Sequence, residues 1–463
     1  LAWQHNIGYR LSEKFSEPGQ IWITEDVCRA VGIDVESISR RDPNKSLRDL
    51  TAELDFVTLA VDEGWGMGGG QSEKPQLGTW TRVFRSDREN LKGPLVVLIP
   101  GMTRKQGNDN PILVDADPAR IARRLQMFAD GLGYPLKINS GVTAIDLMLQ
   151  LRPKTRSPLE WRDVVFAPSR TKEPYGITDI ESDFEWSRKP TDDEMAMTYV
   201  HAYDRGGSYP AAIAGLELPI GDPIHHPDGV QFDPKLPGYW QIEVPESQDW
   251  LLPFLLNPRG HKFNGPKWVC TPRLERAIAL GYQPTVLEAY VWPQHGRILR
   301  GWYERFRDVA LKLDTADPDD RAVRDQAKIA RVAGIGLMGS LQHMEGKTGY
   351  SPERRYHIVS KASASIVYKL QQIGASSGQW PLACITDTVL YASNDPDPVS
   401  AWPGDAKSFG RGFGQYKPEG SALLADQLEF LTGQNYRGKQ QLASPDQWRA
   451  EMLSGTETSG ERD

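Results

Sequence analysis

The sequence predicts a multidomain protein in which an α/β region precedes an α+β region. Its length of 463 residues exceeds what one hydrophobic core normally supports, so two or three domains are expected. In the first part, the apolar run Leu95–Pro100 is typical of a buried strand, and a well-delimited helix follows it. From Met195 to Tyr416 the expected strands and helices alternate irregularly, which is typical of an α+β domain.

Capping and periodicity define the elements of the first part. The helix expected over Asp117–Leu132 begins with an N-cap Asp followed by Pro, and Gly133 ends it. Leu54–Val61 is a β-type run. With further strands expected at Leu136–Ile138 and Ala144–Leu149, we predict a strand-helix-strand unit within an α/β domain over residues 50–165.

The second part begins after a predicted linker. Thr171–Asp193 is rich in Pro and in charged residues, which favours an irregular connection. Arg300–Leu313 and Arg321–Met338 have helical periodicity and predict an αα-hairpin. The small polar residues from Ser454 onward predict a disordered tail.

Composition places the chain among ordinary globular proteins. It is 39% hydrophobic and 25% charged, with a formal charge of −7 that disfavours bulk affinity for nucleic acid but does not exclude a local basic groove. There is no apolar run long enough for a membrane span and no secretory signal pattern. The three Cys form no CxxC pair, so we expect no zinc site and a cytoplasmic location.

Two acidic residues far apart in the chain have the surroundings of a metal site. Thr198–Pro210 reads as a short strand that brings Asp204 to a glycine-rich turn, and Tyr209 follows that turn. A second expected strand, Ala383–Tyr391, carries Asp387. Two strand-borne carboxylates suit a pair of divalent ions that clamp the attacking and leaving oxygens of a phosphoryl transfer. Alternatively, each Asp is an ordinary turn residue at a strand end.

Four cations mark the second helix of the predicted αα-hairpin. Their spacing of three, four and three residues places them on one helical face. Like charges so close repel one another, so an anionic partner such as a triphosphate would stabilise them. The alternative is a solvated face with neighbouring Asp residues as counterions. The four residues are Arg321, Arg324, Lys328 and Arg331.

The stretch around the first Asp resembles motif A of family B DNA polymerases, in which an Asp precedes Leu-Tyr-Pro. Asp204, Tyr209 and Pro210 match that motif, and Ser208 replaces the Leu. The resemblance implies that Asp204 binds metal and that Ser208 and Tyr209 contact the nucleotide. The Tyr209 ring would then lie under the sugar and exclude a 2′-hydroxyl. The alternative for Tyr209 is a packed core aromatic.

The stretch around the second Asp resembles motif C of the same family, Asp-Thr-Asp-Ser. In the preferred register Ile385 replaces the first Asp, Asp387 keeps the metal-binding one and Thr388 replaces Ser. A competing register places Asp387 on the first Asp and Val389 on the second, which would make the site inactive. The preferred register implies that Asp204 and Asp387 together hold two Mg²⁺, with Mn²⁺ as an alternative.

The basic helix resembles motif B, Lys-x-x-x-Asn-Ser-x-Tyr-Gly, in either of two registers. Lys328 with Gly336 fits one register, and Arg331 with Gly339 fits the other; neither keeps the Asn or the Tyr. The resemblance implies a triphosphate-binding role for Lys328 and Arg331, and Arg324 lies on the same face.

A further segment resembles the one that follows motif C and approaches DNA in this family. It is Gly412–Gly420, and it implies that Lys417 touches backbone phosphate, with Thr386 as a second DNA contact. The alternative for Lys417 is a plain surface lysine.

The protein-primed branch of the family, which has a compact fingers hairpin, fits best, and the resemblance covers roughly residues 195–420. It implies an RNase H-like, exonuclease-type domain, expected to be inactive, followed by a palm with an antiparallel sheet and helical-hairpin fingers. The expected parts are an N-terminal segment (1–50), the exonuclease-type domain (51–170), a linker (171–193), the palm (194–299 and 341–420), the fingers (300–340), a small thumb-like region (421–453) and the tail (454–463).

The function implied by the resemblance is template-dependent DNA synthesis, as expected for an enzyme of a mobile or linear element. Its partners would be DNA primer-template and dNTPs, together with a terminal protein if a protein hydroxyl primes the reaction, and no membrane. The alternative is a catalytically inactive, polymerase-derived protein that binds DNA or telomere ends. An RNA-directed or primase-like enzyme on a related palm is a third possibility.

Overall fold

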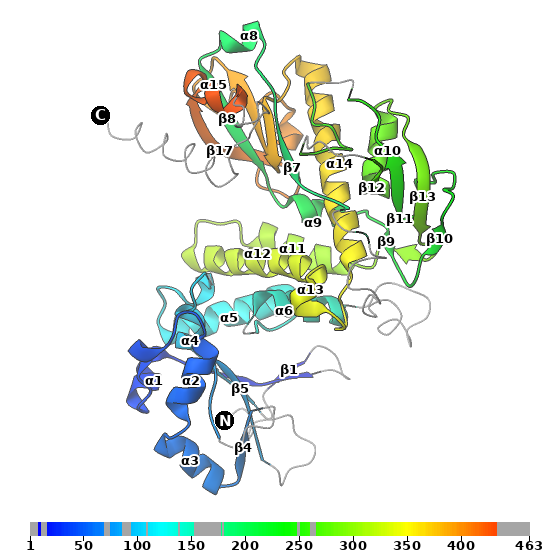
Figure 1. Ribbon diagram of the computed structural model, residues 1–463. Helices are drawn as coiled ribbons and strands as arrows, with labels where there is room; N and C mark the ends of the chain where they lie inside the picture. Colours follow the sequence, from blue (N-terminus) through cyan, green and yellow to red (C-terminus); the bar gives the residue numbers. More distant parts are fainter. Residues whose placement is uncertain are drawn as a thin grey trace, which may run out of the picture. The chain divides into compact units, whose positions relative to one another are not determined.

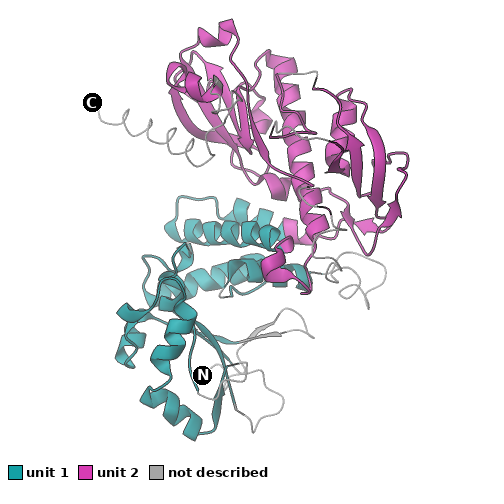
Figure 2. Ribbon diagram, in the orientation of Figure 1, with its two compact units in different colours: residues 1–151, 304–337 teal, residues 152–303, 338–463 magenta. Residues whose placement is uncertain are grey.

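The computed structural model divides the chain into two compact units (Figure 2). Residues 1–151 and 304–337 form the first unit, and residues 152–303 and 338–463 form the second. The structure describes residues 8–10, 16–68, 75–85, 94–107, 110–137, 139–151, 177, 180–247, 251–259 and 265–432. The predicted tail, and the thumb-like region beyond residue 432, lie outside these residues.

The first unit contains a small mixed sheet with strand order β3-β6-β5-β4. Only β3 and β6 run parallel, and the other pairs are antiparallel. Its strands and helices, with a separate β1–β2 pair, are β1 (Gly8–Arg10), β2 (Ser16–Pro18), β3 (Gln20–Ile23), α1 (Glu25–Ala30), α2 (Pro43–Thr51), α3 (Asp55–Asp62), β4 (Trp65–Met67), β5 (Trp80–Arg85), β6 (Leu95–Leu98), α4 (Ile99–Thr103), α5 (Pro118–Leu132) and α6 (Ser140–Gln150).

The strand-helix-strand unit predicted for the first part is wrong. α5 is confirmed, with Asp117 as N-cap and Gly133 as left-handed C-cap. Leu54–Val61 is helical in α3, because residues spaced along a helical face, Leu54 and Val57, pack into the core of this unit. Ala144–Leu149 is also helical, since Asn139 caps α6 by accepting from two backbone N–H groups.

The predicted αα-hairpin is confirmed as α11 (Arg300–Lys312) and α12 (Pro318–Met338). Residues 304–337, which include most of this hairpin, belong to the first unit. A Cβ on Gly141 would lie 2.5 Å from Leu337 Cδ1, so the glycine lets α6 and α12 approach closely. The Asp319 carboxylate, in the first turn of α12, accepts hydrogen bonds from two arginines of α5. The donors are Arg124 Nε at 2.7 Å and Arg120 Nε at 2.6 Å.

The second unit is built on a five-stranded antiparallel sheet with order β17-β8-β16-β15-β7. Its strands are β7 (Phe184–Ser187), β8 (Tyr199–Arg205), β15 (Ala383–Thr386), β16 (Thr388–Ser393) and β17 (Tyr416–Leu423). Alternate residues of these strands face opposite sides. One face packs on α14 (Pro352–Ser377), and the other packs on α15 (Leu424–Thr432).

A second antiparallel sheet, with order β10-β13-β11-β12, completes this unit. Figure 1 shows α14, in yellow, between the two sheets. The remaining elements are α8 (Asp192–Met195), α9 (Ser208–Ile213), β9 (Leu218–Pro219), β10 (Ile224–His226), β11 (Gly238–Glu243), β12 (Lys267–Cys270), α10 (Thr271–Ala279), β13 (Thr285–Val291), β14 (His295–Gly296) and α13 (Leu341–Met344).

The linker predicted for residues 171–193 is wrong where the structure describes it. Residues 184–187 form β7, the edge strand of the five-stranded sheet. Glu181 is buried in an ion pair with Arg273 on α10. Charged residues in this stretch favour a solvated connection, but the buried Glu181–Arg273 ion pair attaches the stretch to the core of the second unit. Among the described residues, no helix combines the length and apolar character that a membrane crossing needs.

Candidate active site

The first predicted carboxylate, Asp204, lies at the end of the central strand β8. Its cross-strand neighbours are Thr388 on β16 and Lys417 on β17. Val200 and Ala202, which share its face of the sheet, pack in the core on the α15 side. The carboxylate follows them beyond that core, where its side chain remains 20% exposed. The strand therefore holds the backbone rigidly and presents the acid at the margin of the core.

Two glycines after Asp204 allow the chain to turn beneath a neighbouring loop. Gly207 has a φ of 56°, and a Cβ there would lie 2.7 Å from Phe413 Cδ1. The N–H of Gly206 donates to the carbonyl of Gln415 at 2.9 Å. α9 begins directly afterwards at Ser208, which is buried and accepts from Arg205 Nη1 at 3.3 Å. Ser208 thus fixes the start of the helix that carries Tyr209.

The second predicted carboxylate, Asp387, lies in a tight turn and not within a strand. Ile385 pairs with Thr388, so Thr386, the last residue of β15, and Asp387 lie at the tip of the hairpin formed by β15 and β16. Thr386 has a φ of 55°, which for a β-branched residue is a strained conformation that costs about 1–3 kcal/mol. The N–H of Arg205 donates to the carbonyl of Asp387 at 3.1 Å, which places this turn beside the end of β8.

The electrostatics agree with this proximity. Tyr416 on β17 is buried, and burial raises the pKa of its phenol. The nearby Arg205 opposes that rise, whereas the negative charges of Asp387 and Asp204 both add to it. Both carboxylates therefore lie close enough to act on one buried hydroxyl, although they are remote in sequence.

Lys417 forms an ion pair with the first carboxylate, Asp204. Its ammonium Nζ is 2.7 Å from Asp204 Oδ2, and its side chain is 41% exposed. Next to it, β17 has a bulge that leaves Glu419 as an extra residue between two paired ones. Glu419 Oε2 accepts a hydrogen bond from the Thr388 hydroxyl at 2.8 Å. The strand end thus combines acids with one cation that neutralises part of their charge.

A third carboxylate, Asp183, belongs to this site and was not predicted from the sequence. Phe184 on β7 pairs with Thr386, so Asp183 lies next to the turn that carries Asp387. The Tyr209 hydroxyl donates to Asp183 Oδ1 at 2.7 Å. Burial raises the pKa of Tyr209, and the charge of Asp183 raises it further, so the phenol stays protonated. Asp183 was overlooked because the surrounding stretch was taken for a linker.

The oxygen donors suit divalent cations that arrive together with a substrate. Mg²⁺ is commonly held by one or two carboxylates and by substrate phosphates. Among the described residues, no group of three or more His, Cys, Asp or Glu is arranged to hold a metal by itself. Asp204 and Asp387 supply oxygen donors of the kind that divalent cations prefer.

The row of cations on α12 is divided by burial. Arg321 and Lys328 are exposed, whereas Arg331 is only 6% exposed. Arg324 Nη1 is 3.4 Å from Asp314 Oδ1 in the turn before α12. Burial, together with the charge of Arg324, lowers the pKa of Arg331 to about 10, so it stays charged at neutral pH. Of the three site residues predicted on this helix, Lys328 is the most accessible to a phosphate.

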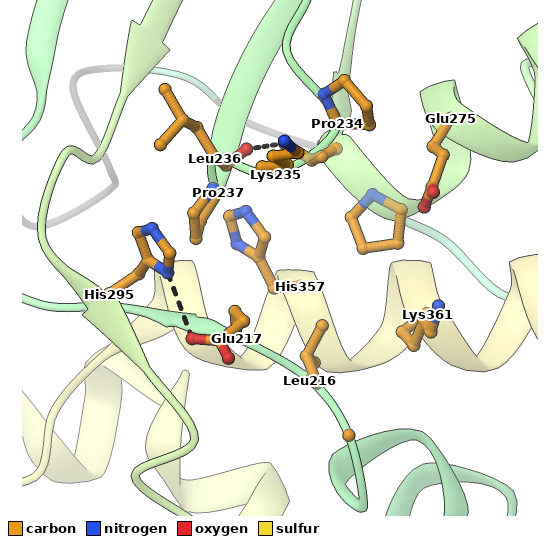
Figure 3. A pocket seen from close by; sticks show the side chains of 13 residues that line it. Leu216, Glu217, Pro234, Lys235, Leu236, Pro237, Glu275, His295, His357 and Lys361 are labelled. Carbon is orange, nitrogen blue, oxygen red and sulfur yellow. Dashed lines mark hydrogen bonds and ion pairs between the residues drawn. The ribbon is translucent and has the colours of Figure 1, made fainter.

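A pocket of about 350 Å³ lies elsewhere in the second unit, between α10, α14 and two loops (Figure 3). His357 lines it and is held by the backbone, through Glu353 O at 2.7 Å and the Gly238 N–H at 3.1 Å. Burial lowers the pKa of His357 to about 4, so the ring is neutral. The lining residues do not include Asp183, Asp204 or Asp387. This pocket is therefore separate from the carboxylates.

No protein-family model and no curated protein matches the chain. Solved structures of phi29 DNA polymerase do resemble it. The ternary complex with primer-template DNA and incoming nucleotide is 12% identical, with a TM-score of 0.45, covering 75% of this chain and 68% of that one. An orthorhombic crystal form is 13% identical, with a TM-score of 0.45, covering 82% and 73%. The complex with single-stranded DNA is 12% identical, with a TM-score of 0.45, covering 80% and 74%. At this level of likeness, the activity of the chain has to be inferred from its own residues.

Proposed function

We propose that the chain is a template-dependent DNA polymerase of the family B type, which transfers nucleotides from dNTPs to a 3′-hydroxyl. The observation that carries this proposal is the contact between the ends of β8 and β16. There the register aligns Asp204 with Thr388, and Arg205 N–H donates to Asp387 O. Two acids that the sequence separates are thereby neighbours at one sheet end. A terminal protein whose hydroxyl primes synthesis is an alternative primer.

In this proposal Asp204 and Asp387 hold two Mg²⁺, or Mn²⁺, together with the nucleotide phosphates. The ions would neutralise charge on the phosphates and activate the attacking hydroxyl. Lys417 compensates the charge of Asp204 while no substrate is bound, and its exposed ammonium then turns to a DNA phosphate. The strained Thr386 turn holds Asp387 in place and offers a second contact to DNA.

In this proposal the nucleotide is held by the side chains that the sequence singled out for that role. Lys328 binds the triphosphate directly, and the less accessible Arg324 and Arg331 add positive charge along the same helix. Ser208 fixes the start of α9, and the Tyr209 ring lies against the sugar and selects a deoxyribose.

The test is extension of a DNA primer-template with dNTPs and Mg²⁺ by the full chain. We expect Asp204→Asn and Asp387→Asn each to lower the rate by about a thousandfold or more, because each removes a charged oxygen ligand from the metals. Asp228→Asn removes the same charge from an exposed position outside the site and is the matched control. Extension that is equally fast with Asp204→Asn would overturn the proposal.

A second candidate is a polymerase-derived protein that binds DNA ends without catalysis. The observation in its favour is the Lys417–Asp204 ion pair, which already provides one metal-binding carboxylate with a cation. Such a protein would show salt-sensitive binding to DNA ends that needs no divalent ion, and no extension. Lys417→Gln would weaken that binding, whereas in an active polymerase it would mainly lower the extension rate.

A further inference from the structure

Asp183 is linked to Tyr209 by a hydrogen bond that leaves the phenol little freedom. A tyrosine hydroxyl has one proton to donate, and here it goes to Asp183 Oδ1 at 2.7 Å. Hydrogen bonds to a carboxylate are stronger than those between neutral groups. Since the phenol proton is already bonded to Asp183, the Tyr209 ring can contact a substrate, but the hydroxyl cannot donate a hydrogen bond to it. The orientation of that ring then depends on Asp183.

The backbone just before Asp183 is held by Arg273, which forms the most buried ion pair of the second unit's described residues. Arg273 Nε is 2.7 Å from Glu181 Oε2, and the two side chains are 1% and 0% exposed. Arg273 Nη2 also donates to the Ser182 carbonyl at 2.9 Å. On the other side of Asp183, β7 is paired to β15 from Phe184 onward. The backbone is thus fixed on both sides of the residue that receives the Tyr209 hydroxyl.

Asp183 could also act as a third metal ligand, but its geometry favours a different role. The described residues contain no group of three acids, His or Cys placed to share one ion. Its carboxylate instead accepts a hydrogen bond from the Tyr209 hydroxyl on α9. The carboxylate is therefore already engaged with the Tyr209 hydroxyl.

We propose that Asp183 is a specificity-determining positioning residue, which anchors Tyr209 so that its ring discriminates between the sugars of incoming nucleotides. This inference rests on the proposed function, because it assigns the sugar contact to Tyr209. Without the anchor, the ring can move aside and tolerate a 2′-hydroxyl. Removing the anchor would therefore change kcat/KM for ribonucleotides more than for deoxynucleotides. If Asp183 had a purely structural role, its removal would change both values equally.

The experiment compares wild type with Asp183→Ala, Asp183→Asn, Tyr209→Phe and the Asp183→Ala/Tyr209→Phe double variant. For each, kcat/KM is measured for dATP and ATP on one primer-template, and Kd is measured separately for both nucleotides with Ca²⁺ in place of Mg²⁺. We expect Asp183→Ala and Tyr209→Phe each to lower the dATP-to-ATP ratio by about tenfold, the scale of one charge-assisted hydrogen bond. The dATP-to-ATP ratio of the double variant should be no lower than that of either single variant, because both changes remove the same hydrogen bond.

Asp183→Asn keeps an acceptor oxygen and should retain most of the selectivity, and Asp228→Ala is the control for lost charge. Tyr209→Phe leaves every acid in place, so it tests the anchor even if Asp183→Ala does not fold. If the wild type extends the primer but the dATP-to-ATP ratio is unchanged in Asp183→Ala and Tyr209→Phe, the inference is overturned and the polymerase proposal stands. Absence of wild-type extension overturns the polymerase proposal, and the Kd ratios then decide the inference. If neither nucleotide binds, both are overturned.

Discussion

The two charged regions of this chain, the basic face of α12 and the acidic end of the five-stranded sheet, are assembled by different means. On α12 the cations are close in sequence, and the helix alone places them on one face. At the sheet end Asp204 and Asp387 are remote in sequence, and strand pairing alone brings them together. In α12, however, packing leaves Lys328 exposed and buries Arg331.

Helical spacing thus identifies a face of α12, but burial decides which charges on that face are accessible to a ligand. The same contrast appears in the buried ion pairs of the two units. Glu181 and Arg273 fasten the edge of the sheet in the second unit, and Asp319 joins α12 to α5 in the first. Variants of these residues can separate charges that support the fold from charges that meet a substrate.

The largest effect on stability is expected from Arg273→Met. This change leaves the Glu181 carboxylate buried without its partner, which should lower the free energy of unfolding by about 3–5 kcal/mol. Urea unfolding measures the loss. Arg276→Met on the same helix is the control: its guanidinium lies over the Tyr368 ring at 4.4 Å, and its removal should cost about 1 kcal/mol or less. Equal losses in the two variants would contradict a special role for the buried pair.

A smaller loss is expected from Arg124→Met in the first unit. Arg124 is 4% exposed and donates to Asp319 Oδ1 at 2.7 Å, so its removal should cost about 2–3 kcal/mol. The cost stays below that of Arg273 because Arg120 still contacts Asp319. Arg123→Met is the control, because Arg123 is an exposed neighbour on the same helix. This variant should unfold at nearly the same urea concentration as the wild type. A neutral result for Arg124→Met would mean that Asp319 does not hold α12 to α5.

The smallest effect, and one on binding and not on stability, is expected from Lys328→Gln. An exposed ammonium that meets a triphosphate should contribute about tenfold to nucleotide affinity. We expect Kd for dATP to rise by that factor while the melting temperature stays constant, as isothermal titration and thermal unfolding would show. Lys312→Gln on α11 removes an exposed charge from the same hairpin and should leave both unchanged. A lower melting temperature without a change in Kd would indicate a structural lysine.

Part of the fold could be predicted because its signals are local. The caps at Asp117 and Gly133 defined α5, and apolar spacing defined the hairpin α11–α12. Where the hydrophobic pattern was short, the prediction failed: Leu54–Val61 was taken for a strand but packs as a helix. Short apolar runs do not distinguish the two, since the choice depends on what the residues pack against.

Sequence patterns alone identified Asp204 and Asp387 as candidate ligands and the helical face that carries Lys328. Helical hydrogen bonds join residues four apart, so a helix face can be read from nearby residues. Three further features became visible only in the folded chain: Asp183 lies at the site, Lys417 pairs with Asp204, and Arg331 is buried. Strand partners can come from any part of a chain, and their register, which no local pattern specifies, decides which side chains meet.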